Sequence, residues 1–190
     1  MRSRSRQGFT MVELMVTIVV ITIVTSVLAS SAFRFLQEQR LRQSANELVS
    51  YLITARARAL REATDYGKAC EVELNASTKT VKPTTHSDNI CNDTPSLPPL
   101  DLLFASGGSD LTITSSAGLS PFLITFTRMG TVASTNLSSV TVVTLPRIFY
   151  FSNDSPGATQ VQRCVMVDLN SVRLGWRNTS AAATCTYDGN

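Results

Sequence analysis

The 190-residue sequence is poor in the residues that mark fibrous and disordered chains. It has only 9 glycines and 7 prolines, which excludes a collagen-like or low-complexity chain. Charged residues make up 16% of the chain against 43% hydrophobic residues, so a packed core is expected. The net charge of +3 matches the contribution of Arg2, Arg4 and Arg6 alone, so no basic field for nucleic acid extends over the whole protein.

Patterns that support catalysis or metal binding are equally scarce. His86, the single histidine, lies alone in a Ser/Thr-rich segment, which is typical of a solvated loop. The segment Ser106–Ser109 has neither the lysine of a phosphate-binding loop nor a Gly-x-Ser-x-Gly elbow, so we interpret it as a turn. We predict that the chain is not an enzyme and has no catalytic residues, cofactor or metal. Four residues carry oxygen atoms that calcium binds, but their spacing matches no EF-hand and favours a polar loop: Asp88, Asn89, Asn92 and Asp93.

The four cysteines include no Cys-x-x-Cys motif. An even number without that motif favours disulfides in an oxidising compartment over a metal cluster or a redox site. Three pairings are open from the sequence alone, and four buried free thiols are the alternative. We favour Cys70 with Cys91 and Cys164 with Cys185, because each pair closes a short loop of similar length.

No charged residue occurs between Leu14 and Phe33, and about 20 such residues can cross the hydrocarbon core of a membrane as a helix. The arginines before this run favour a cytoplasmic N-terminus, although further arginines follow the run closely. One interpretation is an ordinary signal peptide with a cut site among the small residues Ala29–Ala32. Glu13 argues against it, because an ionisable group in an apolar helix is unfavourable unless it has a partner.

The stretch Gly8–Glu13, behind a short basic leader and ahead of the apolar run, resembles the class III leader of type IV pilins and type II secretion pseudopilins. The resemblance implies that a prepilin peptidase cuts after Gly8 and methylates the new N-terminus, Phe9. It also implies that Glu13 neutralises the N-terminal amine of a neighbouring subunit in a filament. The partners would be other pilins or pseudopilins, the peptidase and an inner-membrane assembly platform. A secreted or anchored β domain with ordinary signal cleavage and another function is the alternative.

The residues after the apolar run predict a helix that packs on a β-rich lobe. No proline or glycine interrupts Phe9 to Asp65, so one helix is expected, and Gly67 marks its end. Apolar residues at intervals of four and three form one helix face: Leu41, Ala45, Leu48, Leu52, Ala55 and Ala59. Beyond Gly67, alternating runs predict antiparallel strands at Glu71–Leu74, Leu111–Thr114, Phe122–Thr127, Val140–Val143, Arg147–Phe151, Val161–Val167 and Val172–Trp176.

We therefore expect an α+β, pilin-like fold, in which a long N-terminal helix packs on a C-terminal antiparallel β lobe. The expected organisation is a prepilin leader at 1–8, a transmembrane helix at 9–33, an amphipathic helix at 34–65 and a β-rich periplasmic lobe at 66–190. Thr84–Pro99 is expected to form a long loop closed by the first disulfide. The protein would be a single-pass inner-membrane protein, with a cytoplasmic N-terminus and a periplasmic lobe, before it enters a filament.

Three further segments narrow the resemblance from the pilin-like family to one of its subfamilies. The segment Ala55–Arg61 looks like the helix end of one subfamily, and Phe126–Gly130 resembles its Phe-x-x-x-Gly turn. The segment Val165–Asp168 lies where this subfamily has its penultimate strand. This subfamily contains pseudopilin H and the minor pilins FimT and FimU, and it primes or caps filaments. The likeness therefore implies a minor subunit of a pilus or of a secretion pseudopilus.

The likeness to FimT also implies a role in DNA uptake, as an alternative function. The Gly-Arg-x-Arg signature of that protein is absent from the corresponding stretch, 170–177. Phosphate could still be held by Arg173 and Arg177, with Arg163 nearby. Trp176, which lies between Arg173 and Arg177 in the sequence, could stack a base. The other interpretation is that Trp176 packs in the core of the lobe and the arginines are solvated.

Overall fold

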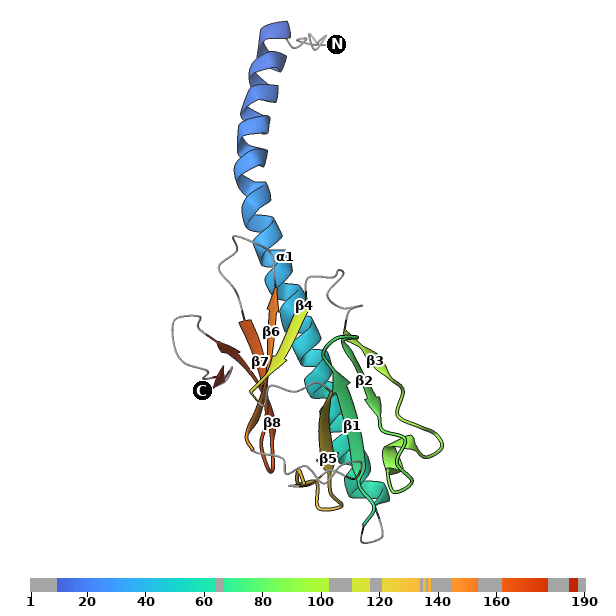
Figure 1. Ribbon diagram of the computed structural model, residues 1–190. Coiled ribbons are helices and arrows are strands. Elements are labelled where there is room, and N and C mark those ends of the chain that lie inside the picture. The colour runs from blue at the N-terminus through green and yellow to red at the C-terminus, as the bar shows by residue number, and fades with distance from the viewer. Residues whose placement is uncertain are drawn as a thin grey trace, which may run out of the picture. The chain divides into compact units, whose positions relative to one another are not determined.

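The computed structural model describes residues 10–63, 67–102, 111–116, 121–133, 135, 137, 145–153, 162–177 and 185–187. The chain divides into two compact units, residues 1–36 and residues 37–190. Helix α1, Met11–Glu62, contributes residues to both units and is 52 residues long (Figure 1). The expectation of one uninterrupted helix is therefore confirmed, with ends a few residues inside those expected. Gly67 follows it in the left-handed region, with a φ of 101°, where glycine is favoured.

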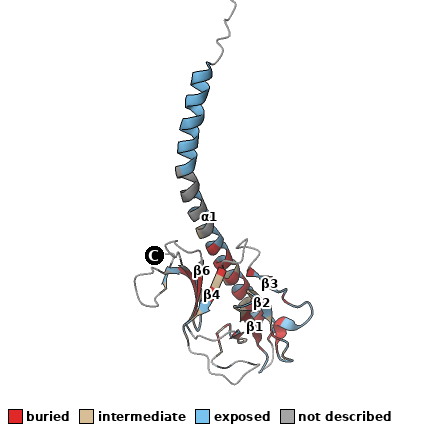
Figure 2. Cartoon of the chain, turned by 45° about the horizontal axis from the view of Figure 1, so that its top comes forward, coloured by how far each residue is buried: buried red, intermediate tan, exposed pale blue. Residues whose placement is uncertain are grey.

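The predicted apolar stripe is the buried face of α1 in the second unit. All six of its members are buried. Figure 2 shows this part of α1 coloured largely as buried where it lies beside the strands. Tyr51 and Ala63 extend the buried face. Ser44 lies on the same face, where its hydroxyl donates to the carbonyl of Arg40 at 3.1 Å, within its own helix. The amphipathic pattern in the sequence thus predicts correctly which face of this part of the helix is buried.

The first sheet is antiparallel, with the strand order β3-β2-β1-β5. It confirms the strands expected near 71–74 and 122–127. β2 and β3 were not predicted, because β2 has four residues and β3 has two, which is too short to show an alternating pattern. The segment expected as a long loop contains a short 3₁₀ helix, η1, Ile90–Asn92. The strands are β1, Cys70–Asn75; β2, Thr80–Pro83; β3, Leu100–Asp101; and β5, Phe122–Phe126.

The second sheet is also antiparallel, with the order β4-β6-β7-β8-β9. Four of its strands were expected from the sequence, while the two-residue β9 was not. The strand expected at Val140–Val143 lies outside the described residues. The strands are β4, Leu111–Ser115; β6, Arg147–Asn153; β7, Gln162–Val167; β8, Val172–Arg177; and β9, Thr186–Tyr187.

The core of the second unit lies between α1 and the two sheets. Phe122 of β5 and Phe149 of β6 pack edge to face, with their ring centroids 5.5 Å apart, so an aromatic pair joins the sheets. Arg147 of β6 joins them a second time, because its Nη1 donates to the carbonyl of Leu123 in β5 at 3.0 Å. Burial lowers the pKa of Arg147. The fold class is α+β, as expected: a helix packed against antiparallel sheets.

Candidate assembly site on the N-terminal helix

Glu13 lies in the first turn of α1. Thr10 precedes the helix, and its Oγ1 accepts a hydrogen bond from the backbone N–H of Glu13 at 3.3 Å, which caps the helix. A carboxylate in the first turn is favoured by the partial positive charge of the helix N-terminus. Glu13 is exposed, and it forms no ion pair with any residue that the structure describes. The site therefore presents a negative charge that is open to a cation from outside the described chain.

The residues that follow Glu13 are apolar on every side of the helix. From Met11 to Val24, the exposed large hydrophobic side chains are between 49% and 79% accessible. They occur at eleven positions of this short segment and so do not form a single stripe: Met11, Val12, Leu14, Met15, Val16, Ile18, Val19, Val20, Ile21, Ile23 and Val24. Such a surface is unfavourable in water and is typical of a helix that is covered by lipid or by other helices.

The polar side chains of this segment are satisfied by the helix itself. The hydroxyls of Thr17 and Thr22 each donate to the carbonyl three residues earlier at 2.8 Å. Thr25 donates to the carbonyl of Ile21 at 2.8 Å, and Ser26 donates to that of Ile23 at 2.8 Å. In an apolar environment, a hydroxyl without a partner is costly, and bonds of this kind remove that cost. These four hydroxyls therefore do not prevent burial of the segment.

Both disulfides pair the cysteines as favoured from the sequence, Cys70 with Cys91 and Cys164 with Cys185. The first joins β1 to η1, and the second joins β7 to the residue before β9. No described cysteine is free. The pairing is thus a confirmed prediction, and each bond fixes a segment of little regular structure to a sheet.

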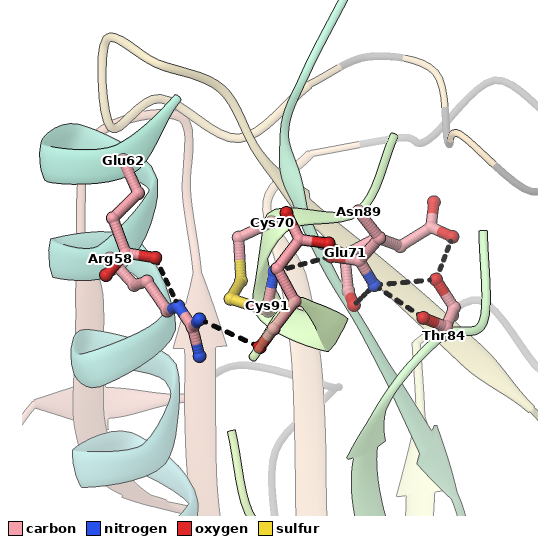
Figure 3. Close-up of a disulfide and its surroundings, with 8 residues drawn as sticks. Arg58, Glu62, Cys70, Glu71, Thr84, Asn89 and Cys91 are labelled. Carbon is pink, nitrogen blue, oxygen red and sulfur yellow. Dashed lines mark hydrogen bonds and ion pairs between the residues drawn. A yellow bond between two sulfur atoms is a disulfide. The ribbon is translucent and has the colours of Figure 1, made fainter. Parts of the chain in front are cut away.

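Arg58 anchors the end of α1 beside the first disulfide (Figure 3). Its Nε donates to the carboxylate of Glu62 at 2.7 Å, one turn along the helix. Its Nη2 donates to the backbone carbonyl of Asp93 at 3.2 Å, just beyond η1. The side chain is buried, so this arginine is part of the packing of helix against loop and is not a solvated charge.

Asn89 is not placed as a calcium ligand in this fold: its buried amide forms hydrogen bonds with backbone groups of three segments (Figure 3). Its Oδ1 accepts from the backbone N–H groups of Glu71 and Cys91 at 2.9 and 3.1 Å. Its Nδ2 donates to the carbonyls of Glu71 and Thr84 at 2.7 and 2.8 Å. Asn92 is exposed, and so is Asp88, whose carboxylate lies 3.7 Å from Nδ1 of His86. Within the described residues, no group of three or more His, Cys, Asp or Glu side chains could hold a metal ion.

Glu71 is a fully buried carboxylate whose role the sequence analysis missed. It lies on β1 and accepts hydrogen bonds from the hydroxyls of Thr84 at 2.9 Å and Thr125 at 2.8 Å. It also accepts from the backbone N–H of Leu137 at 2.6 Å. A charged residue next to Cys70 and Val72 in an alternating strand was the one available signal. The groups that donate hydrogen bonds to it come from distant parts of the chain, so they could not be inferred from the sequence around Glu71.

The described residues considered as possible DNA contacts do not share one surface. The strand register pairs Arg163 with Trp176 and Met166 with Arg173. Directly opposed residues of antiparallel strands project to the same face, while successive residues alternate. Trp176 therefore lies on the face of Arg163, and Arg173 lies on the other face. The side chain of Arg177 lies outside the described residues.

Two of these residues also have environments that differ from those expected. Arg163 is buried, and its Nη2 donates to the carboxylate of Glu38 in α1 at 2.8 Å. It is therefore not an exposed contact for phosphate. Trp176 is 41% exposed, so it does not pack in the core as the other interpretation required. Among the described side chains, Arg163, Arg173 and Trp176 form neither a shared basic and aromatic surface for nucleic acid nor a core centred on the tryptophan.

Comparison with known proteins adds one finding at the N-terminus. Residues 3–29 match the family model of the prokaryotic N-terminal methylation motif. Neither the curated proteins nor the solved structures give a significant match to the chain. The chain thus carries the leader motif of type IV pilins and pseudopilins, which are structural subunits and not enzymes.

This motif has consequences for processing and location. A leader of this kind implies cleavage by a prepilin peptidase, anchoring in the inner membrane before filament assembly, and pilin-like partners. Among the residues that the structure describes, none of the helical segments searched is both long and apolar enough to span a membrane.

Proposed function

We propose that the chain is a minor pilin or pseudopilin, a structural subunit that primes or caps a type IV pilus or a type II secretion pseudopilus. The observation that carries this proposal is the environment of Glu13. It is an exposed carboxylate in the first turn of a helix, and it has no ion-pair partner among the described residues. The surface after it is apolar on all sides. Such a carboxylate is suited to a cation that a neighbouring subunit supplies during assembly.

The proposed mechanism begins with cleavage after Gly8, which creates a new amine on Phe9, and continues with methylation of that amine. The processed subunit waits in the inner membrane with its N-terminal helix in the lipid. An assembly platform then transfers this helix from lipid to a bundle of similar helices, so its apolar surface stays covered throughout. Glu13 pairs with the N-terminal amine of a neighbour and sets the register, since each unpaired charge is costly inside the bundle.

The assignment to a minor subunit is supported by features of the lobe. The Phe126–Gly130 motif forms a turn in which Gly130 has a φ of 69°. An added Cβ at this glycine would lie 3.0 Å from the side chain of Leu60 near the end of α1. Both the backbone conformation and the close approach therefore require glycine here. The motif thus has a structural reason in this chain, in keeping with its likeness to the subfamily of pseudopilin H, FimT and FimU.

The test of this proposal is mass spectrometry of the mature N-terminus, on protein from cells that express it naturally. We expect a chain that begins with methylated Phe9. A mature terminus among residues 29–32 would show ordinary signal cleavage and would overturn the proposal.

Incorporation into filaments tests the role of Glu13 separately. Glu13→Ala should lower incorporation by about tenfold or more, since an amine in the bundle loses its counter-charge. Glu47→Ala is a matched control, because this glutamate lies on the same helix and, among the described residues, bonds with the neighbouring Gln43 at 3.1 Å. Equal incorporation of the two variants would contradict the register role.

A further inference from the structure

The turn between β1 and β2 carries a sequence that suits a covalent modification. Asn75, Ala76 and Ser77 form an Asn-x-Ser triplet, which is the acceptor motif for glycans attached to asparagine. Asn75 is the last residue of β1, and its partner in the register, Thr80, is the first residue of β2. The residues between them form the turn, in which Ser77 is exposed. The triplet therefore lies in a surface turn, which is the structural context that this motif requires.

The side-chain amide of Asn75 is oriented by this turn. Its Oδ1 accepts from the backbone N–H groups of Ser77 at 3.0 Å and of Thr78 at 3.1 Å, and from the hydroxyl of Ser77 at 2.6 Å. Because a backbone N–H can only donate, these bonds identify the oxygen end of the amide. Among the described residues, Nδ2 of Asn75 has no hydrogen-bond partner, and it is not one of the buried polar atoms that lack one. The nitrogen that would carry a glycan is therefore accessible to solvent.

A carboxylate distinguishes this triplet from the others in the chain. Asn-x-Ser/Thr triplets begin at five positions, Asn75, Asn92, Asn136, Asn153 and Asn178. Only the first has an acidic residue two positions earlier, Glu73. Alternate residues of a strand project to the same face, about 7 Å apart, so the carboxylate lies beside the amide. An enzyme that recognises the triplet thus also meets a negative charge at a fixed distance from it.

The face of β1 that carries Asn75 is not the face that packs on α1. Cys70, Val72 and Leu74 are alternate residues of this strand, and they belong to the core between the helix and the sheets. Asn75 follows Leu74, so its side chain projects to the opposite face. A bulky group attached to Nδ2 of Asn75 therefore leaves the packing of the helix on the sheet undisturbed.

We propose that Asn75 is glycosylated on Nδ2 by a membrane-bound transferase, with a sugar linked to a polyprenyl diphosphate as the donor. Nδ2 forms a bond to the anomeric carbon of the sugar, and the bond from that carbon to the diphosphate oxygen breaks. The polyprenyl diphosphate leaves with the electron pair, and a proton of Nδ2 passes to a base of the transferase. Glu73 contacts a cation of the transferase and aligns the amide. The two disulfides indicate an oxidising compartment, so the reaction requires export of the lobe but not its assembly into a filament.

The test is mass spectrometry of the full chain isolated from cells that express it naturally, with fragmentation that keeps sugars on their side chains. We expect the added mass of a glycan on Asn75. Asn92 is the matched control, because its triplet lacks the acidic residue, and it should be unmodified. Asn75→Gln should abolish the added mass. An unmodified Asn75, or a sugar on Ser77 or Thr78 in its place, would overturn the proposal.

Two further positions test how the site is recognised. Ser77→Thr should keep the glycan because it keeps the hydroxyl, whereas Ser77→Ala should lower the occupancy of Asn75 by about tenfold or more. Glu73→Gln should lower the occupancy by about tenfold, since it removes the charge and keeps the shape of the side chain. Formation of both disulfides shows that each variant folds. Full occupancy in the Ser77→Ala variant would contradict glycosylation through the triplet, and full occupancy in Glu73→Gln would contradict the role of the carboxylate.

The N-terminus of the same sample distinguishes this inference from the proposed function. A glycan on Asn75 of a chain with ordinary signal cleavage supports the modification and rejects the filament subunit. Methylated Phe9 on a chain with an unmodified Asn75 rejects the modification alone.

Discussion

Arg163 of β7 and Glu38 of α1 form an ion pair of 2.8 Å, although 125 positions separate them in the sequence. The two side chains differ in environment: that of Arg163 is 10% exposed and that of Glu38 is 42% exposed. Trp176, the single tryptophan, lies opposite Arg163 in the strand register. The pair therefore links helix and sheet beside a natural fluorescent reporter.

The unequal burial of this pair predicts unequal effects of mutation. Glu38→Ala leaves a buried guanidinium without its carboxylate and should lower the free energy of unfolding by about 2 kcal/mol. Arg163→Met leaves a carboxylate that water can reach and should cost less, about 1 kcal/mol or below. Urea unfolding of the full chain in detergent, followed by tryptophan fluorescence, measures both. Equal losses, or a larger loss for Arg163→Met, would contradict this account.

Tyr51 predicts a change of stability at high pH. Its hydroxyl is buried without a partner among the described groups, and burial raises the pKa of Tyr51 from 10.0 to about 12. The folded state therefore holds this proton more tightly than the unfolded chain does. The contribution is fully present below pH 10 and is lost as the pH rises through about 12.

The comparison of wild type with Tyr51→Phe isolates this effect, because other groups titrate equally in both. The variant should be at least as stable at neutral pH, since it removes a hydroxyl without a partner. Its advantage should grow above pH 10, as wild type alone loses this contribution. An advantage that shrinks over this range would show that the hydroxyl is hydrated or hydrogen-bonded.

Asn89→Ala should be among the most destabilising single changes in the lobe. It removes five hydrogen bonds from a fully buried amide and leaves buried backbone groups of β1 and η1 unsatisfied. We expect a loss of about 3 kcal/mol in the free energy of unfolding. Asn92→Ala, at an exposed position in η1, should change it by about 0.5 kcal/mol or less. A small effect at position 89 would mean that water replaces the amide.

Gly175→Ala should interfere with the second disulfide. An added Cβ would lie 2.7 Å from Sγ of Cys185 and would overlap the carbonyl oxygen of Thr186 in β9. Residue 185 must therefore move, and labelling should detect free thiol at Cys164 and Cys185 while Cys70 and Cys91 stay bonded. Gly67→Ala is the control, since an added Cβ there meets nothing within 4 Å and affects only the backbone conformation. Complete oxidation of the Gly175 variant would contradict the prediction.

The parts of the fold that were predictable depend on patterns within one segment. The buried stripe of α1 repeats at the helical period, and six of the nine described strands have five residues or more, so both are long enough to be recognised in the sequence. The two-residue strands β3 and β9 exist only because partners pair with them. The leader motif was predictable for the same reason, because Gly8, Phe9 and Glu13 lie within six consecutive residues.

The residues whose roles the sequence did not reveal depend on distant partners. Arg163 was considered as a contact for phosphate under the alternative function, but it pairs with Glu38 of the helix. For Asn89 the sequence favoured a polar loop over a calcium site, and in the fold its amide bonds with groups of β1, of η1 and of Thr84. The polarity of a residue shows that it needs a partner, and only the fold shows which partner it has.

Both disulfides join cysteines that are consecutive in the chain, Cys70 with Cys91 and Cys164 with Cys185. Under the proposed function the lobe crosses the inner membrane, so a thiol oxidase on the far side can complete the first bond before the third cysteine arrives. The correct bonds then follow from the order of emergence. Oxidative folding of the lobe should therefore not depend on a disulfide isomerase.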